Sequence, residues 1–396
     1  MGTLADMDLK GKRALIRVDF NVPMKNDGSI ADDSRIQSAL PTIQYALQQG
    51  AKVIVLSHFG RPKSVSPQFS LQPCRERLSE LLGIPVTLAP DCIGEEVEQI
   101  VDSMQEGDVV LLENSRFHAA EEHPDKDPHF AEQLAKLGDL YINDAFGASH
   151  RSHTSIVALP EQFSSGKRAA GLLLQKEIDF LGNALLEPQK PFYALIGGSK
   201  ISTKLGVLKS LLNKTDAIFI GGAMAFTFLK AQGKEIGDSL YEEDMLEEAQ
   251  EILSMAQEKG VEICLPVDVV AGVHFANDTP FEVFDAAKGV PEGYQGLDVG
   301  DKTLKVWKEK LQQGKTILWN GPVGVFEFSQ FAKGTEEIAR ILASLDGVTT
   351  IAGGGETIAA LQNIHLADAF SHISTGGGAC LEYIEHETLP GIKVLA

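Results

Sequence analysis

The chain has 396 residues, of which 43% are hydrophobic and 23% are charged, a composition typical of a soluble globular protein with two or three domains. Its formal net charge of −20 argues against general nucleic-acid binding and against attraction to anionic membranes. Any anionic ligand must therefore be held by a local cluster of basic groups.

Short apolar or β-branched runs alternate with helical patterns along the whole chain. The strands predicted in the first half lie at 13–18, 52–57, 108–112 and 140–143, and those in the second half at 192–197, 217–221, 316–320, 349–353 and 371–374. Such alternation predicts βαβ units, and hence an α/β fold of doubly wound parallel sheets with helices on both faces.

The clearest helical pattern is SRIQSALPTIQYALQQG, at 34–50, for which Ser34 is the expected N-cap and Gly50 the expected residue after the last turn. A second pattern begins at Leu172 and is ended by Pro188 and Pro191. This second helix has the length of a connector between two α/β lobes. After it, the loops become much richer in glycine.

The chain carries no sign of export or of a membrane span. The N-terminus, MGTLADMDLK, lacks a basic segment followed by an apolar core, and the run AIFIGGAMAFTFL is too short to cross a bilayer. No C-x-x-C pair occurs. We expect a cytoplasmic protein whose cysteines are reduced, buried thiols, namely Cys74, Cys92, Cys264 and Cys380.

Ligands of open parallel sheets bind at the carboxyl ends of the strands, so the residues that follow each strand are informative. In the first half these segments read VDFN, SHFGR, ENSRF and NDAFGASHR, and Arg35 lies near the start of the helix after the first strand. They gather basic and polar groups at one edge of one sheet: Asp19, Asn21, His58, Arg61, Arg116, His150 and Arg151.

Each of these arginines, taken alone, could equally pair with an acid to hold a loop. Their recurrence at equivalent places favours a pocket for a carboxylate or phosphate, which arginine binds bidentately. His150 and His153 could suggest a metal site, but no cysteine or acid at a fitting spacing completes one.

In the second half the strand ends read IGGSK, IGGAM, NGPVGVFE, AGGGET and STGGGA. One glycine loop would most simply be a tight turn, but a series of them before helices is typical of phosphate binding. Lys200 and Lys204 lie four residues apart and can face the same phosphates. This cradle also contains acids, and so suits a nucleotide with its magnesium ion.

Two familiar nucleotide motifs are absent. The GKT at 314–316 lacks the earlier glycine of a P-loop, because Glu309 stands there, and no stretch fits G-x-G-x-x-G. A pocket for a small acid and a cradle for a nucleotide together indicate phosphoryl transfer, which depends on positioning and charge neutralisation rather than on a protein nucleophile.

The motifs RVDFNVP, SHFGRP, LLENSRFH, NDAFGASHRSH, IGGSKISTKLGVL, WNGPVGVFE, GGGET and SHISTGGGACLE resemble, in order and over nearly the whole chain, those of the phosphoglycerate kinase family, in its bacterial form. The resemblance implies reversible transfer of the acyl phosphate of 1,3-bisphosphoglycerate to ADP, giving 3-phosphoglycerate and ATP, by in-line transfer after hinge closure. It also implies two Rossmann-like lobes. The first, 1–170 with the tail 385–396, would bind 3-phosphoglycerate, 171–187 would be the connecting helix, and 188–384 would bind the nucleotide.

The resemblance also implies site residues and partners. Arg35 and Lys204 would be catalytic, and Mg²⁺ would be held by Glu356. The partners would be the two phosphoglycerates and ADP or ATP, without nucleic acid or membrane, and the protein would be a monomer. The substrate residues would be Asp19, Phe20, Asn21, Arg35, His58, Phe59, Gly60, Arg61, Arg116, His150 and Arg151. The nucleotide residues would be Lys200, Lys204, Gly296, Glu327, Gly354, Gly355, Glu356 and Thr357.

The chain departs from the family pattern at Phe59, where leucine is usual, and at Glu356, where the family has an aspartate as magnesium ligand. Two other classes compete with a kinase. A nucleotide- or anion-binding regulator with the same fold would be expected to have lost Arg35, Lys204 or the metal-site acid, and all are present, the acid as glutamate. An NAD-dependent dehydrogenase is disfavoured by the missing glycine fingerprint.

Overall fold

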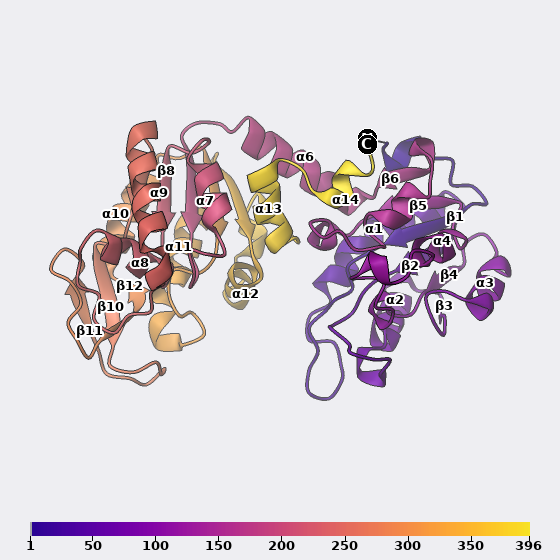
Figure 1. Cartoon of the computed structure of the whole chain (residues 1–396), viewed down its shortest axis with the longest axis horizontal. Coiled ribbons are helices and arrows are strands. Elements are labelled where there is room, and N and C mark those ends of the chain that lie inside the picture. The colour runs from indigo at the N-terminus through magenta and orange to yellow at the C-terminus, as the bar shows by residue number, and fades with distance from the viewer. Residues whose placement is uncertain (1) are drawn as a thin grey trace. The chain divides into compact units, whose positions relative to one another are not determined.

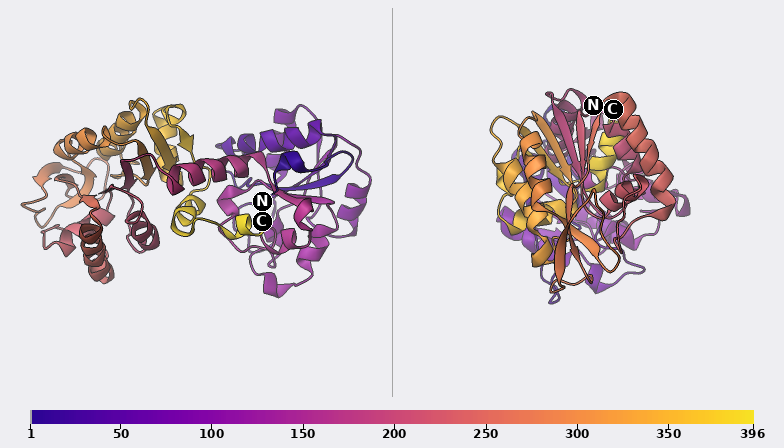
Figure 2. Two further views of the ribbon diagram at one scale, coloured as in Figure 1. Left: turned by 90° about the horizontal axis from the view of Figure 1, so that it is seen from above. Right: turned by 90° about the vertical axis from the view of Figure 1, so that its left-hand side faces the viewer.

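The computed structural model describes residues 2–396, except for the side chains of Asn183 and Leu186. The chain forms two compact units, and each contains its own six-stranded parallel sheet. Unit 1 comprises the residues up to Asp179 together with Thr388–Ala396, and unit 2 comprises Phe180–Glu387. Figure 2 shows helices on both faces of each large sheet, as expected for a doubly wound fold.

The sheet of unit 1 has the strand order β3-β4-β2-β1-β5-β6. Its strands are β1 (Arg13–Arg17), β2 (Lys52–Leu56), β3 (Val86–Leu88), β4 (Val109–Leu111), β5 (Leu140–Asn143) and β6 (Arg168–Ala170). Its helices are α1 (Ser34–Gln48), α2 (Gln72–Leu82), α3 (Glu95–Asp102), α4 (Phe130–Ala135), α5 (Ala158–Glu161) and α14 (Pro390–Lys393). The order reverses between β1 and β5, so the switch point of this sheet lies at their carboxyl ends.

The large sheet of unit 2 has the order β15-β14-β13-β7-β8-β9. Its strands are β7 (Phe192–Ile196), β8 (Ala217–Ile220), β9 (Glu262–Cys264), β13 (Thr316–Asn320), β14 (Thr349–Gly353) and β15 (His372–Ile373). The helices are α7 (Leu205–Leu211), α8 (Met224–Ala231), α9 (Leu246–Lys259), α10 (Asp301–Leu311), α11 (Lys333–Ala343), α12 (Gly355–Asn363) and α13 (Gly378–His386). Here the order reverses between β7 and β13.

Unit 2 also contains a small antiparallel sheet in the order β11-β10-β12, which sequence patterns did not predict. Its strands are β10 (Asp268–Gly272), β11 (Phe281–Asp285) and β12 (Gln295–Val299). A register shift between Val270 and Ala271 interrupts the β10–β12 pairing. The sheet packs on α8 through Phe226 and Leu229.

Helix α6 (Leu172–Leu186) carries the chain from unit 1 into unit 2. Asp144, which is buried after β5, accepts hydrogen bonds from the amides of Leu173 (2.9 Å) and Leu174 (3.2 Å), and so satisfies the first turn of this helix. The chain returns to unit 1 after α13, and α14 lies on that unit near the C-terminus (Figure 1).

Two local predictions need correction. Ser34 is not the N-cap of α1 but its first residue, and the cap position belongs to Asp33. The Ser34 amide donates to Asp32 Oδ1 (2.7 Å), which starts the helical turn earlier than expected. Gly50 follows α1 with a φ of +77°, as predicted for the residue after the C-cap. Of the four cysteine thiols, Cys264 is only half-buried, because β9 is the edge strand of its sheet.

None of the helices formed by the described residues combines the length and the apolar character that a membrane span needs.

Candidate active site

The loop after β1 carries the first of the predicted substrate residues of unit 1, at the switch point of the sheet. Asp19 is half-buried and accepts a hydrogen bond of 2.7 Å from Arg35 Nη1, which comes from the first turn of α1. Burial acts to raise the pKa of Asp19, but His58, Arg35 and Arg17 hold it below its ordinary value. When His58 is uncharged, Arg35 and Arg17 alone lower the pKa of Asp19. Asp19 is therefore an anion beside the sheet edge, and it positions Arg35.

The loop after β2 is fastened to its neighbours by two asparagines. Asn21 Oδ1 accepts the Gly60 amide (2.8 Å), and Asn114 exchanges hydrogen bonds with the backbone of Phe59 at 2.8 and 3.0 Å. The rings of Phe20 and Phe59 are buried in the core of unit 1. Their rings therefore belong to the core of unit 1 and are not exposed to a ligand.

Three arginines predicted for the pocket differ in how they are held. Arg116 is buried, donates to the Gly60 carbonyl (2.7 Å) and pairs with Glu122 (3.0 Å). Burial lowers the pKa of Arg116 slightly, yet its guanidinium stays charged at any physiological pH. Arg151 is half-buried and its Nε donates to His150 Nε2 (3.3 Å). Arg61 is exposed and makes no ion pair with any of residues 2–396. Arg61 is thus the arginine most available to a ligand.

One group of metal-type side chains lies in unit 1, formed by Asp91, Cys92 and His118, whose ligand atoms all lie within 4.8 Å of one another. His118 Nε2 and Asp91 Oδ1 are already 2.6 Å apart, and burial raises the pKa of the Cys92 thiol well above its ordinary value. Because His118 is already paired with Asp91 and the Cys92 thiol keeps its proton, we interpret this group as a structural contact rather than a metal site. His153, in which burial lowers the pKa to about 3, lies 3.9 Å from Glu122 and apart from this group.

In unit 2, Lys204 lies at the switch point between β7 and β13. Its Nζ donates to the Gly197 carbonyl (2.5 Å) and to Asn320 Oδ1 (3.1 Å), the last residue of β13. Burial lowers the pKa of Lys204 to about 8, and the nearby Glu356 carboxylate opposes this shift. A cation held at the strand ends without a directly bonded acid is suited to receive a phosphate.

Asn320 was not singled out by sequence analysis, although it is the last letter of the predicted strand TILWN. It is 3% exposed, and its Nδ2 has no hydrogen-bond partner among residues 2–396. An ideal Cβ built on Gly354 would lie 3.2 Å from that nitrogen. A buried donor without a partner is costly, so its presence beside the glycine triplet points to a ligand oxygen there.

The glycine triplet forms the end of β14 and the start of α12. Gly354 is the N-cap and has a φ of +94°, a conformation that favours glycine, whereas a Cβ on Gly355 would meet nothing within 4 Å. Thr357 is buried and its Oγ1 accepts the Gly321 amide (2.7 Å), which ties this helix to the loop after β13. The start of α12 therefore has open space beside Gly355, and a helix N-terminus is a common place for an anion to bind.

Glu356 and Lys200 are both exposed, and Glu356 belongs to this cradle. Glu356 lies in the first turn of α12 and is close enough to Lys204 to influence its charge. An exposed carboxylate beside phosphate-binding groups fits a magnesium ion that is shared with phosphate oxygens. The sequence prediction placed these groups together, and the structure brings Lys204, Gly354, Gly355, Glu356 and Thr357 to one edge of the sheet.

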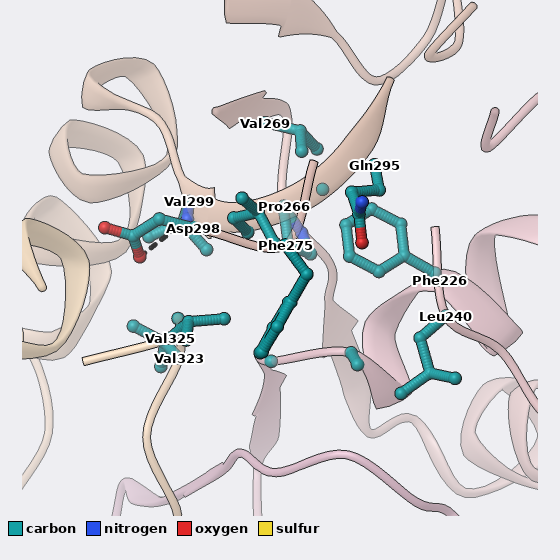
Figure 3. Close-up of a pocket in the computed structure, with 15 residues that line it drawn as sticks. Phe226, Leu240, Pro266, Val269, Phe275, Gln295, Asp298, Val299, Val323 and Val325 are labelled. Carbon is teal, nitrogen blue, oxygen red and sulfur yellow. Dashed lines mark hydrogen bonds between the residues drawn. The ribbon is translucent and has the colours of Figure 1, made fainter. Parts of the chain in front are cut away.

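An apolar pocket with a volume of about 360 Å³ lies beside the small sheet (Figure 3). Gly296 of β12, which was predicted to line the adenine pocket, is among the residues that line this one, and a Cβ at this position would overlap the ring of Phe226. Exposed side chains of Leu240 and Phe275 stand at the mouth of the pocket. Its size and its largely carbon walls suit a planar heterocycle. Glu327 is exposed and is not among the residues that line this pocket.

Asp298 is another residue that lines the pocket, and sequence analysis did not single it out. It accepts the amides of Gly334 (2.7 Å) and Val299 (2.9 Å), and burial raises its pKa to about 7. In Figure 3 its carboxylate points away from the pocket. Asp298 therefore fixes the end of β12 to the start of α11. The only sequence signal for this role was its position in the strand segment QGLDV.

Residues 4–387 match the family model described as phosphoglycerate kinase. The chain belongs to the phosphoglycerate kinase family. It is 51% identical over 397 residues to the cytosolic phosphoglycerate kinase of Triticum aestivum, covering all of this chain and 98% of the relative. A phosphoglycerate kinase of Dictyoglomus turgidum is 52% identical over 392 residues, which cover 99% of this chain and 97% of the relative. The solved phosphoglycerate kinase structure from Coxiella burnetii superimposes with a TM-score of 0.88 at 39% identity, covering all of this chain and 98% of that one.

The predicted family and α/β class are therefore confirmed, and the chain has phosphoglycerate kinase activity, a step of glycolysis and gluconeogenesis. Phosphoglycerate kinases generally use a magnesium nucleotide. Plant relatives, including one named as chloroplastic, match as well as bacterial ones do, so identity does not single out the bacterial form that was predicted.

Proposed function

We propose that unit 1 binds 3-phosphoglycerate, that unit 2 binds ADP or ATP with Mg²⁺, and that the acyl phosphate passes directly between them after hinge closure. Closure would exclude water, which would otherwise hydrolyse the acyl phosphate of 1,3-bisphosphoglycerate. The observation that carries this proposal is the unpartnered, buried Asn320 Nδ2 beside Lys204 and Gly354.

In unit 1, the carboxylate and phosphate of 3-phosphoglycerate are held by arginine forks. The exposed Arg61 and the half-buried Arg151 bind the anionic ends, whereas Arg116 also braces the Gly60 loop. Asp19 and Asn21 orient the glycerate, and His150 lies beside Arg151. The pocket is positive although the whole chain is strongly acidic, and this supports the binding of a small dianion.

In unit 2, the apolar pocket at Gly296 takes the adenine and Glu327 takes the ribose hydroxyls. Lys200, Lys204 and the first amides of α12 take the phosphates, with Asn320 Nδ2 as a further donor. Lys204 and Arg35 neutralise charge on the phosphoryl group in flight, which needs no covalent intermediate. Mg²⁺ supplies further charge neutralisation when it is bound, and Glu356 is the residue that would hold it.

The proposed setting is a monomer in the cytoplasm that acts on small molecules alone. A decisive test is a coupled assay with 3-phosphoglycerate, ATP and Mg²⁺. We expect turnover that disappears in Lys204→Ala and persists in Lys209→Ala, a control on the exposed side of α7 where the lysine pairs with Glu251 (2.8 Å). Loss of turnover in both variants alike, or turnover without nucleotide, would overturn the proposed assignment.

A further inference from the structure

Arg17, the last residue of β1, is fully buried and sits directly behind the substrate pocket of unit 1. Its guanidinium donates from Nε to Ser155 Oγ (2.7 Å) and from Nη1 to the Val18 carbonyl, and its Nη2 lies 3.0 Å from His58 Nδ1. This arginine was not among the predicted site residues. It is not exposed to a ligand, so any role in the reaction must be exerted through a neighbour.

Arg17 is itself held by a buried acid. Glu121 is fully buried, its Oε1 accepts the Ser155 hydroxyl (2.6 Å), and it lies 3.6 Å from Arg17 Nη2. The Ser155 amide donates to the other oxygen of Glu121 (3.2 Å). The guanidinium is therefore compensated in charge and fixed in direction, and its Nη2 cannot swing away from His58 without leaving hydrogen bonds unmade.

The chemistry of arginine fixes the state of the histidine. A guanidinium has only N–H donors and does not lose its proton in proteins, so His58 Nδ1 must be the acceptor of this contact. An imidazole whose Nδ1 accepts carries its proton on Nε2. That nitrogen faces Asp19, but the 3.7 Å between Nε2 and Asp19 Oδ1 is too long for a hydrogen bond. The Nε2–H is thus available to a third group at the pocket.

We propose that Arg17 is a positioning residue that holds His58 as the neutral Nε2–H tautomer, so that His58 donates a hydrogen bond from Nε2 to an oxygen of the bound glycerate. The second half of this proposal rests on the proposed function, whereas the tautomer does not. His58 then adds a directed donor to the pocket rather than a positive charge, and the arginines alone supply the charge.

The electrostatic surroundings agree with this geometry. Burial lowers the pKa of His58 well below its ordinary value, and Arg17, Arg116 and His153 act in the same direction, whereas Asp19 opposes them. Glu121 is a further charged group on this side of the ring, 3.6 Å from the Arg17 Nη2 that contacts His58. A second proton on Nδ1 would also point directly at the Arg17 guanidinium.

The tautomer can be read without substrate. Nitrogen NMR of the imidazoles in the intact protein, with the His58 signals assigned by their loss in His58→Gln, should show a protonated Nε2 and an unprotonated Nδ1. We expect this pattern to persist from about pH 5.5 to about pH 8, a range in which an ordinary histidine changes charge. A protonated Nδ1, or a titration of His58 within this range, would overturn the proposal.

The donation to glycerate is tested by a matched pair of variants. The amide nitrogen of glutamine can reach the place of Nε2, whereas that of asparagine reaches only the place of Nδ1. We expect His58→Asn to raise the KM for 3-phosphoglycerate about tenfold, as for one lost hydrogen bond, and His58→Gln to raise it about threefold or less. Equal KM values in the two variants, with the Nε2–H tautomer intact in the parent, would overturn the donation alone.

The role of Arg17 needs a variant that folds. Ser155→Ala removes one partner of Arg17 and keeps the guanidinium, and Arg17→Lys keeps the charge but offers a shorter, differently directed donor. In either folded variant we expect a mixture of His58 tautomers and a higher KM for 3-phosphoglycerate. When the same change is made in the His58→Asn protein, we expect no further rise in KM. An unchanged tautomer in Arg17→Lys would overturn the positioning role. Absence of kinase turnover in the parent would contradict the proposed function, while the NMR measurement would still decide the tautomer.

Discussion

Arg35 of α1 and Asp19 of the loop after β1 are joined by a hydrogen bond of 2.7 Å between Arg35 Nη1 and Asp19 Oδ2. The Arg35 side chain is 38% exposed and the Asp19 side chain 14% exposed. Asp19 holds the partly exposed guanidinium in one direction, so the pair keeps an oriented cation at the edge of the sheet. A ligand that approaches the pocket meets Arg35 already oriented.

Arg35→Ala should impair chemistry more than binding. Because the proposed role is charge neutralisation in the transition state, we expect kcat to fall about 10²-fold or more, with a much smaller change in the KM for 3-phosphoglycerate. Steady-state kinetics measures both constants. Arg77→Ala is a suitable control, because Arg77 has the same exposure and pairs with Asp33 in the same unit. A raised KM with unchanged kcat would make Arg35 a simple binding residue.

Nucleotide binding should draw a proton onto Lys204. Its pKa of about 8 in the unliganded protein leaves it about half charged at pH 8, and phosphate oxygens favour the charged form. Calorimetry at about pH 8 in two buffers of different ionisation enthalpy should therefore give an uptake of about half a proton per nucleotide. Lys204→Arg, which is always charged, should abolish the uptake. Equal uptake in both proteins would place the proton elsewhere.

The lowered pKa of Lys204 also makes the stability of the fold depend on pH. The pKa of Lys204 is lowered from 10.5 to about 8 on folding, so the unfolded chain binds more protons between these values. Stability should therefore rise as pH increases through that window, and this contribution should be missing in Lys204→Met.

Glu356 should act as a magnesium ligand despite its extra methylene group. Glu356→Gln keeps its size and removes the charge, so we expect a steep loss of turnover and a higher magnesium requirement, whereas Glu356→Asp should keep most of the activity. Titration of the rate with Mg²⁺ distinguishes the variants. If Glu356→Gln leaves both kcat and the titration unchanged, the carboxylate only favours the helix dipole, which is worth about 0.3–1 kcal/mol.

Asp298 should make unit 2 less stable as pH rises. Its pKa is raised from 3.8 to about 7 on folding, so the stabilisation is complete below about pH 4 and is lost as pH rises through 7. Urea unfolding at about pH 5 and about pH 8 should show a decrease for the parent that exceeds that of Asp298→Asn by about 2–4 kcal/mol. Parallel pH curves would mean that the Asp298 carboxyl does not titrate in this range.

Closure should require both ligands. If each unit binds one substrate, small-angle scattering should show the largest compaction when 3-phosphoglycerate and nucleotide are present together. The single-ligand samples are the controls, and equal compaction with either ligand alone would contradict the assignment of one substrate to each unit.

Sequence alone predicted the placement of residues best where they directly follow a strand. Lys204 and Glu356 were chosen because they follow strands with glycine-rich ends, and the structure brings them to one sheet edge. Membership of the family extended this selection to Gly296, which lines the pocket although it lies within a strand of the small sheet.

Residues whose partners are distant in sequence were not found. In the sequence, Arg17 is an ordinary polar residue at the end of a predicted strand. Only the folded chain places Glu121 and Ser155 beside it. The small antiparallel sheet was missed because β11 is an exposed edge strand and lacks the apolar run of the buried parallel strands. The N-cap of α1 was misplaced by one residue, because the sequence Asp32-Asp33-Ser34 offers three capping residues in a row.

The segment that follows unit 2 along the chain has a consequence for folding. Gly391 is buried against Ser149, and its carbonyl accepts the Asn143 side chain (3.1 Å), so Thr388–Ala396 are built into the same unit as the residues up to Asp179. Unit 2 is an uninterrupted segment and can fold once its own residues are synthesised, whereas unit 1 must wait until Thr388–Ala396 have followed unit 2. The unit that is begun first is therefore completed last, and a chain that lacks Thr388–Ala396 would leave the end of β5 without its contact to Gly391.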